Sequence, residues 1–204
     1  MFPNLSKTIE GISQIAIAEE RKEVLQPLID YIQNKVNLQQ EIQLNFICTH
    51  NSRRSHLSQI WAQTMAFQFG IQNVFCYCGG TEVTAMFPKV VETLENQRFQ
   101  IQQLSESNNP IYAIKFSENQ QPIIGFSKVF DNDFNPMSEF AAIMTCSSAD
   151  EGCPFIAGAE VRLPIRYNDP KEFDGTKFMN EKYTERSLEI ASEMYYVFSK
   201  IVTI

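Results

Sequence analysis

The stretch from Ile42 to Ser55 constrains the fold of this chain more than any other part of the sequence. A short, largely apolar run ends at Cys48, and five residues separate that cysteine from Arg54. Residues 57–66 then show the apolar periodicity of a helix. A strand that leads through a tight loop into a helix N-terminus is a recurrent oxyanion site, because loop N–H groups converge there and the helix dipole adds positive potential.

The residue types in this stretch suit nucleophilic chemistry on an oxyanion. The thiolate is the reactive form of cysteine, and a helix N-terminus or a nearby cation lowers a thiol pKa from about 8.5 to roughly 3.5–7.5. Arg54 is able to hold a tetrahedral oxyanion with two parallel N–H bonds. Ser55 is placed to hydrogen-bond the Cys48 sulfur and favour its ionised form. The alternative is a buried structural cysteine beside a solvated pair of arginines.

The loop resembles the phosphate loop of low-molecular-weight tyrosine phosphatases and of the thioredoxin-coupled arsenate reductases that share their fold, with the pattern Cys-x-Gly-Asn-x-Cys-Arg-Ser. The candidate oxyanion-binding residues are Thr49, His50, Asn51, Ser52, Arg53, Arg54 and Ser55. Asn51, Arg54 and Ser55 match the pattern, whereas His50 replaces its glycine and Arg53 its second cysteine. Since glycine tolerates backbone angles that other residues resist, we expect the loop to bend differently or His50 to be strained.

The composition narrows the class of protein. A net charge of −7 without a basic run argues against nucleic acid or an anionic membrane as a partner. No apolar run approaches the ~18 residues of a membrane span, and the N-terminus lacks a signal pattern, so a cytoplasmic protein is expected. In a reducing compartment, cysteines more often serve catalysis or metal binding than a disulfide framework. The five cysteines are Cys48, Cys76, Cys78, Cys146 and Cys153.

The pattern of apolar residues predicts an α/β fold. Residues 1–40 are expected to form an added helical pair, the first helix capped by Asn4 or Ser6 with an apolar side reaching Ile17 and the second covering Glu19 to Val36. This extension would pack on the core, residues 41–204, or less readily mediate self-association. We expect a strand from Asn73 to Cys78 that turns at Gly79-Gly80, and a helix from about Pro88 to Asn96.

The second half of the chain adds strands and a closing helix. Further strands are expected at 99–103, 111–116, 123–130 and 140–146, and a long amphipathic helix at 177–202. Alternating strands and helices indicate an open, mainly parallel sheet whose ligands bind at the carboxyl ends of the strands. The resemblance implies a three-layer fold, low-molecular-weight phosphatase-like with flavodoxin-type strand order, with the hairpin near 111–130 as an insertion.

A second group of residues is a candidate for redox chemistry. The segment from Cys146 to Cys153, rich in Ser, Asp and Ala and followed by a proline, resembles the redox segment of thioredoxin-coupled arsenate reductases. Seven residues of helix advance about 10 Å, while the Cα atoms of a disulfide lie within roughly 7 Å. If the segment is helical when reduced, a Cys146–Cys153 bridge must unwind it, which Gly152 would ease. The alternative is two unrelated buried cysteines.

Asp169 is the candidate acid. It stands in Asn168-Asp169-Pro170, and the resemblance implies that such an Asp-Pro lies in a loop over the oxyanion site, where its carboxyl group protonates the leaving oxygen. Tyrosine phosphatases typically follow it with aromatic residues. Here Lys171 and Glu172 follow, which weakens the phosphotyrosine hypothesis.

The resemblance implies a cytoplasmic arsenate reductase with a role in arsenic detoxification. Cys48, Arg54 and Asp169 would carry the first step, and Cys146 and Cys153 the redox steps, with thioredoxin or a similar dithiol as reductant and no cofactor or metal. The alternative is a low-molecular-weight protein tyrosine phosphatase that hydrolyses phosphomonoesters through a phosphocysteine. A third hypothesis, motivated by His50 and Arg53, is a non-catalytic oxyanion-binding module.

Overall fold

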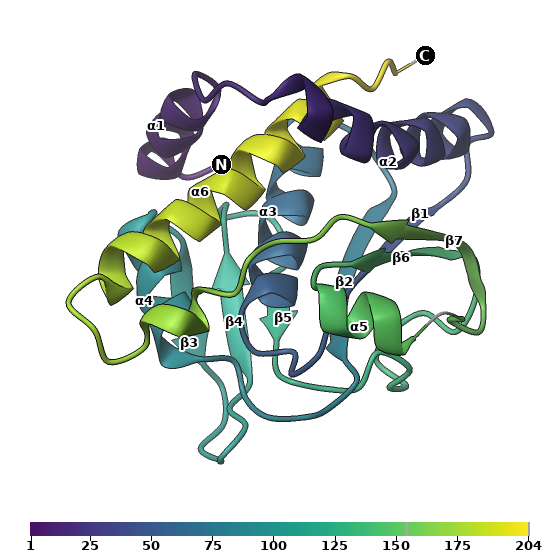
Figure 1. Ribbon diagram of the computed structural model, residues 1–204. Helices are drawn as coiled ribbons and strands as arrows, with labels where there is room; N and C mark the ends of the chain where they lie inside the picture. The colour runs from purple at the N-terminus through teal and green to yellow at the C-terminus, as the bar shows by residue number, and fades with distance from the viewer. Residues whose placement is uncertain (154, 204) are drawn as a thin grey trace.

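The computed structural model describes residues 1–153 and 155–203 of the chain (Figure 1). The helices are α1 (Pro3–Ile12), α2 (Glu19–Asn37), α3 (Arg54–Gln68), α4 (Pro88–Asn96), α5 (Ser147–Gly152), the 3₁₀ helix η1 (Pro170–Phe173) and α6 (Met179–Ser199). The strands are β1 (Ile42–Cys48), β2 (Val74–Gly80), β3 (Gln100–Gln103), β4 (Tyr112–Lys115), β5 (Ile123–Gly125), β6 (Phe140–Met144) and β7 (Ala159–Pro164). Within these described residues, no helix has the length and apolar character needed to cross a membrane.

Four parallel strands form the central sheet in the order β2-β1-β6-β7. Numbered along the chain within this sheet, the order is 2-1-3-4, which is the flavodoxin-type order. Cys48 ends β1 beside Gly80, which ends β2. The predicted fold class, an α/β open and mainly parallel sheet with flavodoxin-type order, is therefore confirmed.

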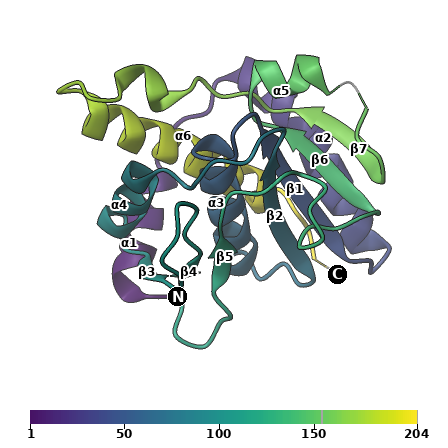
Figure 2. The same cartoon turned by 90° about the horizontal axis from the view of Figure 1, so that it is seen from below.

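The two faces of the sheet are covered differently. Leu44 and Phe46 of β1 belong to the main core together with apolar side chains of α2, α3 and α6. Ile47 points to the opposite face, into a smaller cluster that includes Met144 of β6 and Ala149 of α5. Figure 2 shows α2 behind the sheet and α5 near the ends of β6 and β7. Helices, sheet and α5 thus make the three layers that the resemblance implied.

The inserted hairpin belongs to a second sheet. Strands β3, β4 and β5 pair antiparallel in that order, and β3 lies against α4 (Figure 1). The predicted hairpin is confirmed, but β5 ends at Gly125, so residues 126–130 are free to leave the sheet. There the Lys128 carbonyl accepts a hydrogen bond from the Gly80 N–H, and Val129 forms a parallel bridge with Gly80, so this segment lies beside the end of β2.

Both N-terminal helices contact α6 (Figure 1). α1 begins at Pro3 with Phe2 as its N-cap and ends at Ile12, so the predicted caps and the helical position of Ile17 are wrong. Proline at the first helical position needs no N–H partner, which explains the earlier start. Arg21 of α2 forms a two-bond ion pair with the buried Glu193 of α6. The division of the chain at residue 40 stays a prediction.

The two glycines at the end of β2 continue the strand instead of forming the predicted turn. A Cβ at Gly79 would lie 2.3 Å from the Phe130 Cα. A Cβ at Gly80 would lie 2.6 Å from the carbonyl oxygen of Thr49. Both glycines are therefore needed because other backbone segments approach them closely, rather than because the chain turns there.

Candidate functional site

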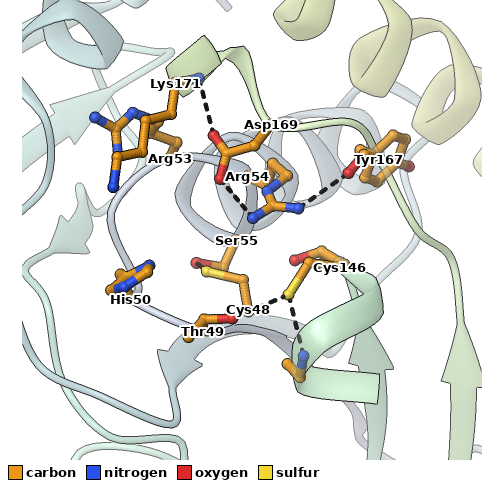
Figure 3. Close-up of polar contacts among 12 residues, drawn as sticks. Cys48, Thr49, His50, Arg53, Arg54, Ser55, Cys146, Tyr167, Asp169 and Lys171 are labelled. Carbon is orange, nitrogen blue, oxygen red and sulfur yellow. Dashed lines mark hydrogen bonds and ion pairs between the residues drawn. The ribbon is translucent and has the colours of Figure 1, made fainter. Parts of the chain in front are cut away.

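The carboxyl ends of the parallel strands bring the predicted site residues together (Figure 3). Cys48 is the last residue of β1, Cys146 is the N-cap of α5 just after β6, and Asp169 is the N-cap of η1 after β7. Residues 49–53 form the loop between β1 and α3. The site occupies the edge of the sheet at which open α/β folds bind ligands.

Every carbonyl group of the loop between Thr49 and Ser52 accepts a hydrogen bond from a surrounding element. The donors are the Glu82 N–H and Thr81 Oγ1 for Thr49, Thr84 Oγ1 and Ser127 Oγ for His50, His56 Nε2 for Asn51, and the Phe87 N–H for Ser52. Their lengths lie between 2.8 and 3.2 Å. The carbonyl groups are thus held on the outer side of the loop.

The N–H groups of the loop are left for a ligand. In a trans peptide the C=O and the following N–H point in opposite directions, so outward carbonyls turn the N–H groups of residues 50–53 inward. None of these four N–H groups has an acceptor among the described residues. Together with the N-terminus of α3 they form a cradle of hydrogen-bond donors, which is the arrangement expected of an oxyanion site.

Asn51 carries the unusual backbone angle of the loop. Its φ is +42°, whereas His50 is not among the residues with positive φ. Asparagine tolerates the left-handed region better than most residues. The loop therefore takes the first of the two predicted solutions: it bends differently, and the left-handed residue is the asparagine rather than the histidine that replaces glycine.

Cys48 lies at the base of the cradle, and its Sγ is 3.1 Å from Ser55 Oγ. Asn51 Nδ2 donates to the same oxygen at 2.8 Å, so the Ser55 hydroxyl proton is directed at the sulfur. Burial raises the pKa of the Cys48 thiol above its usual value, and the Ser55 hydrogen bond and the charge of Arg54 offset part of that increase. This differs from the lowered pKa predicted from the loop pattern, because Cys48 is only 3% exposed.

Arg54 and Asp169 form an ion pair above the cysteine (Figure 3). Arg54 donates to Asp169 Oδ2 at 2.6 Å and to the carbonyl oxygen of Tyr167 at 3.0 Å. The Arg54 Nε is buried and has no hydrogen-bond partner in the described part of the chain. Asp169 also accepts the Lys171 N–H, which fixes its side chain at the start of η1. The predicted anion-binding and acid residues thus contact each other directly.

Arg53, whose role the sequence left open, lines the recess but uses its guanidinium for contacts with other parts of the protein. Its guanidinium donates to Tyr183 Oη at 2.6 Å and to Asp174 Oδ2 at 2.7 Å, and it stacks over the Phe87 ring at 4.1 Å. Tyr183 also donates to Asp174, which closes a ring of three polar groups. Arg53 therefore ties the loop to α6 and to the segment that follows Asp169.

His50 lies at the rim of the site. Its side chain is 41% exposed, and Nε2 is 3.6 Å from a carboxylate oxygen of Glu82. His50 lines a small recess together with other predicted site residues. The recess is lined by Cys48, His50, Ser52, Arg53, Arg54 and Asp169. These residues include no Phe, Tyr or Trp that could sandwich an aryl ring, and they include two arginines that favour an anion.

The two distal cysteines lie at the two ends of α5. Cys146 is buried, and its Sγ is 3.5 Å from Thr49 Oγ1 and 3.4 Å from the N–H of Ala149. Cys153 is half-buried at the C-cap of α5 and is not among the residues that line the recess. The segment is helical with free thiols, which is the condition under which a bridge between these cysteines requires unwinding.

Sequence reasoning missed residues that support the site from a distance. His56 and Lys128 lie behind the loop, and Tyr167 and Asp174 fix the two arginines. His56 directly follows the loop motif, which is the one sequence signal that marks it. The other three come from segments far along the chain, and no spacing rule connects them to Cys48.

Comparison with known proteins supports the fold. Neither a protein-family model nor a curated protein sequence matches the chain. A low-molecular-weight phosphotyrosine phosphatase from Vibrio cholerae has a similar structure, with a TM-score of 0.50 and 14% identity over 78% of this chain and 94% of that one. A low-molecular-weight protein tyrosine phosphatase from T. tengcongensis (TM-score 0.49, 15% identity, 79% and 100% covered) and an arsenate reductase in a phosphate-binding state (0.48, 15%, 79% and 99%) are also similar. The chain therefore has the fold of the low-molecular-weight phosphotyrosine phosphatases.

Proposed function

We propose that this protein is an arsenate reductase that uses three cysteines and a dithiol reductant such as thioredoxin. The observation that carries the proposal is the position of Cys146 beside the oxyanion loop, with its Sγ 3.5 Å from Thr49 Oγ1. A phosphatase needs only one cysteine, Cys48, whereas a reductase needs a second thiol within reach of the first. The residues that line the recess include no Phe, Tyr or Trp, which also favours a small oxyanion over an aryl ester.

In the first step the loop binds arsenate. The inward N–H groups of residues 50–53 and the unpartnered Nε of Arg54 supply donors for its oxygens. The arriving oxyanion competes with Asp169 for the N–H groups of Arg54. The Cys48 thiolate then attacks arsenic, an As–O bond breaks, and Asp169 delivers the proton with which the oxygen leaves as water.

In the second step two electrons pass to arsenic. The Cys146 thiolate attacks Cys48 Sγ, an S–S bond forms, and the S–As bond breaks with its electron pair on arsenic, which leaves as arsenite. Cys153 then attacks Cys146 Sγ, which forms a Cys146–Cys153 disulfide and returns Cys48 as a thiolate. An external dithiol reduces that disulfide and is itself oxidised.

α5 gives the second disulfide a physical route to the reductant. Cys146 and Cys153 cap opposite ends of this six-residue helix. Their Cα atoms must approach within roughly 7 Å to form a disulfide, so the helix unwinds. Gly152 meets no atom within 4 Å of an added Cβ, so the chain around it has room to move. The half-buried Cys153 would then lie in an exposed loop.

The test is turnover of arsenate by the purified protein with thioredoxin, thioredoxin reductase and NADPH. We expect arsenate-dependent NADPH oxidation in the wild type and none in Cys48→Ser or Cys146→Ser. Cys76→Ser is the matched control, because Cys76 is a buried thiol on the neighbouring strand β2 that contacts neither Cys48 nor Cys146 in this mechanism. Unchanged arsenate turnover in Cys146→Ser would overturn the reductase mechanism.

A second candidate function is phosphomonoester hydrolysis. The fold shared with phosphotyrosine phosphatases and the contact between Arg54 and Asp169 favour it. It predicts hydrolysis of an aryl phosphate that is lost in Cys48→Ser, is reduced in Asp169→Asn and is unchanged in Cys146→Ser. Turnover of neither arsenate nor an aryl phosphate, with binding of both arsenate and phosphate, would instead favour the oxyanion-binding module.

A further inference from the structure

A buried network of hydrogen-bonded side chains, which takes no part in the proposed reaction, lies behind the oxyanion loop. His56, in the first turn of α3, is fully buried. Its Nε2 is 3.0 Å from the carbonyl oxygen of Asn51, and its Nδ1 is 3.4 Å from Cys78 Sγ. Lys128, also buried, places its Nζ 3.9 Å from the same sulfur.

The contacts of His56 determine its tautomer. A carbonyl oxygen only accepts hydrogen bonds, so Nε2 must carry the proton that points at Asn51. Burial and the charge of Lys128 lower the pKa of His56 to about 3, so the ring is neutral at physiological pH. Nδ1 is then an acceptor, and the Cys78 thiol is the donor that faces it.

Lys128, at the other end of this hydrogen-bond network, determines which groups donate and which accept. An ammonium group only donates hydrogen bonds, so Lys128 donates to the Cys78 sulfur and leaves the thiol proton for His56 Nδ1. The rings of Phe126 and Phe134 lie 4.4 and 5.2 Å from Nζ and stabilise the positive charge. Because Lys128 also donates its backbone N–H to Asn51 Oδ1, the same residue holds both ends of the arrangement.

The network ends at the peptide between Asn51 and Ser52, which carries one N–H donor of the cradle. With the Asn51 carbonyl held by His56, the Ser52 N–H on the other side of the same peptide faces the oxyanion site. Asn51 also has the positive φ of the loop, so its peptide has no helical or strand hydrogen bonding to fix its orientation. A buried donor at the carbonyl takes over that task.

We propose that His56 is a positioning residue for oxyanion binding, which acts through the Asn51 carbonyl, and that Cys78 and Lys128 hold its imidazole in the Nε2–H tautomer. The proposal rests on the part of the proposed function that all three candidate functions share, the binding of a tetrahedral oxyanion. It adds that the hairpin insertion supports the site, because Lys128 follows β5.

The direct test is the ¹⁵N NMR spectrum of the imidazole in the intact protein, without any ligand. We expect the Nε2–H tautomer of neutral His56 in the wild type and a mixture of tautomers in Lys128→Met. A wild-type ring that carries its proton on Nδ1, or that is doubly protonated at neutral pH, would overturn the proposal. This outcome does not depend on whether the protein binds or reduces arsenate.

The functional test is the dissociation constant for arsenate and for phosphate, measured by calorimetry. His56→Leu removes the donor and is expected to weaken binding about tenfold, because one oriented N–H group of the cradle is lost. His56→Gln keeps an N–H that can reach the carbonyl and is expected to stay within about threefold of the wild type. Equal binding by the wild type and both variants would overturn the proposal.

Gln59→Leu is the matched control. Gln59 lies one turn further along α3, is also buried, and donates to a backbone carbonyl, but to that of Cys76 in β2 instead of the loop. We expect it to lower the melting temperature as His56→Leu does and to leave arsenate binding within about twofold. If both leucine variants bound arsenate more weakly, general destabilisation would explain the loss of binding, and a positioning role for His56 would be contradicted. Failure of the wild type to bind either anion, with the expected tautomer present, would count against the proposed function and not against the positioning of the peptide.

Discussion

The oxyanion loop, residues 48–55, and the redox segment, residues 146–153, meet at one edge of the sheet but are built in opposite ways. In the loop every carbonyl from Thr49 to Ser52 is bonded from outside. The redox segment is a single six-residue helix with a cysteine at each end. In the proposed mechanism the first holds its donors in place before the substrate arrives, whereas the second changes its conformation during each cycle.

Ion pairs help to hold the redox segment in place. Asp150, which is buried in α5, forms ion pairs with Arg162 of β7 and with Arg166. Arg162 also donates to the Cys153 carbonyl at 3.0 Å. A few polar contacts at one side of a short helix are easier to break than the set of hydrogen bonds that surrounds the loop, so the difference matches the two proposed roles.

Two glycine-to-alanine changes, one beside the oxyanion loop and one in α5, are expected to give the largest difference in stability. Gly80→Ala places a Cβ 2.6 Å from the carbonyl oxygens of Thr49 and Glu82, so we expect a loss of about 3 kcal/mol in stability and loss of anion binding. Gly152→Ala meets nothing within 4 Å and is expected to stabilise α5 by about 0.5 kcal/mol. Chemical denaturation of both variants measures the difference, and equal losses would show that the loop is no more tightly packed than the helix.

Cys153→Ser distinguishes the first turnover, which uses Cys48 and Cys146, from repeated turnover, which also needs Cys153. We expect the first turnover of arsenate to proceed, because Cys48 and Cys146 are unchanged, while steady-state turnover with thioredoxin falls about 100-fold. Rapid-quench measurement of arsenite formed per enzyme measures the first turnover, and the rate of NADPH oxidation measures steady-state turnover. Full steady-state activity would mean that the reductant attacks the Cys48–Cys146 bond directly.

Ser55→Ala tests the electrostatics of the loop. The Ser55 hydrogen bond lowers the Cys48 pKa, so its removal should raise that pKa further. The thiolate then forms only at higher pH, and the rising limb of alkylation by iodoacetamide should move up by about one pH unit, with a roughly tenfold slower rate below it. Ser58→Ala is the control, because the Ser58 hydroxyl bonds to the Arg54 carbonyl instead of the sulfur. A shift in both variants would point to a general change in α3.

Arg162→Gln loosens the redox segment and has the smallest expected effect. Loss of its ion pair with Asp150 should speed formation of the Cys146–Cys153 disulfide after a single turnover by about threefold. Mass spectrometry of trapped thiols measures that rate. Lys182→Gln, which breaks an exposed pair with Glu185 on α6, should leave the rate unchanged. A slower rate in Arg162→Gln would mean that the ion pair assists the rearrangement.

The elements with strong local patterns were predictable from the sequence. The strand, loop and helix from Ile42 onward, the helix α4 and the closing helix α6 are confirmed because apolar spacing and proline or glycine positions determine them locally. β7 was missed, since its residues alternate with Glu160 and Arg162, whose polar partners lie on distant elements. Sequence spacing carries no information about such partners.

The candidate site divides in the same way. The order of Cys48, Arg54 and Ser55 follows from a contiguous motif, and Cys146 and Asp169 follow from strand ends that a parallel sheet gathers at one edge. The separate fates of Arg53 and Arg54 did not follow. Two adjacent arginines look equivalent in a sequence, but one bonds to Asp174 and Tyr183 and the other to Asp169.

The local sequence identifies the candidate nucleophile, its loop and the strand–loop–helix order that presents them, because these depend on residues close together in the chain. How that loop is held follows from contacts made in the folded structure. Its outer carbonyls accept hydrogen bonds from residues 81–87, from Ser127 after β5 and from His56 of α3, whose Nδ1 faces Cys78. Burial also reversed the expected direction of the Cys48 pKa, since removal of water from a thiol depends on the whole surrounding core and not on the motif.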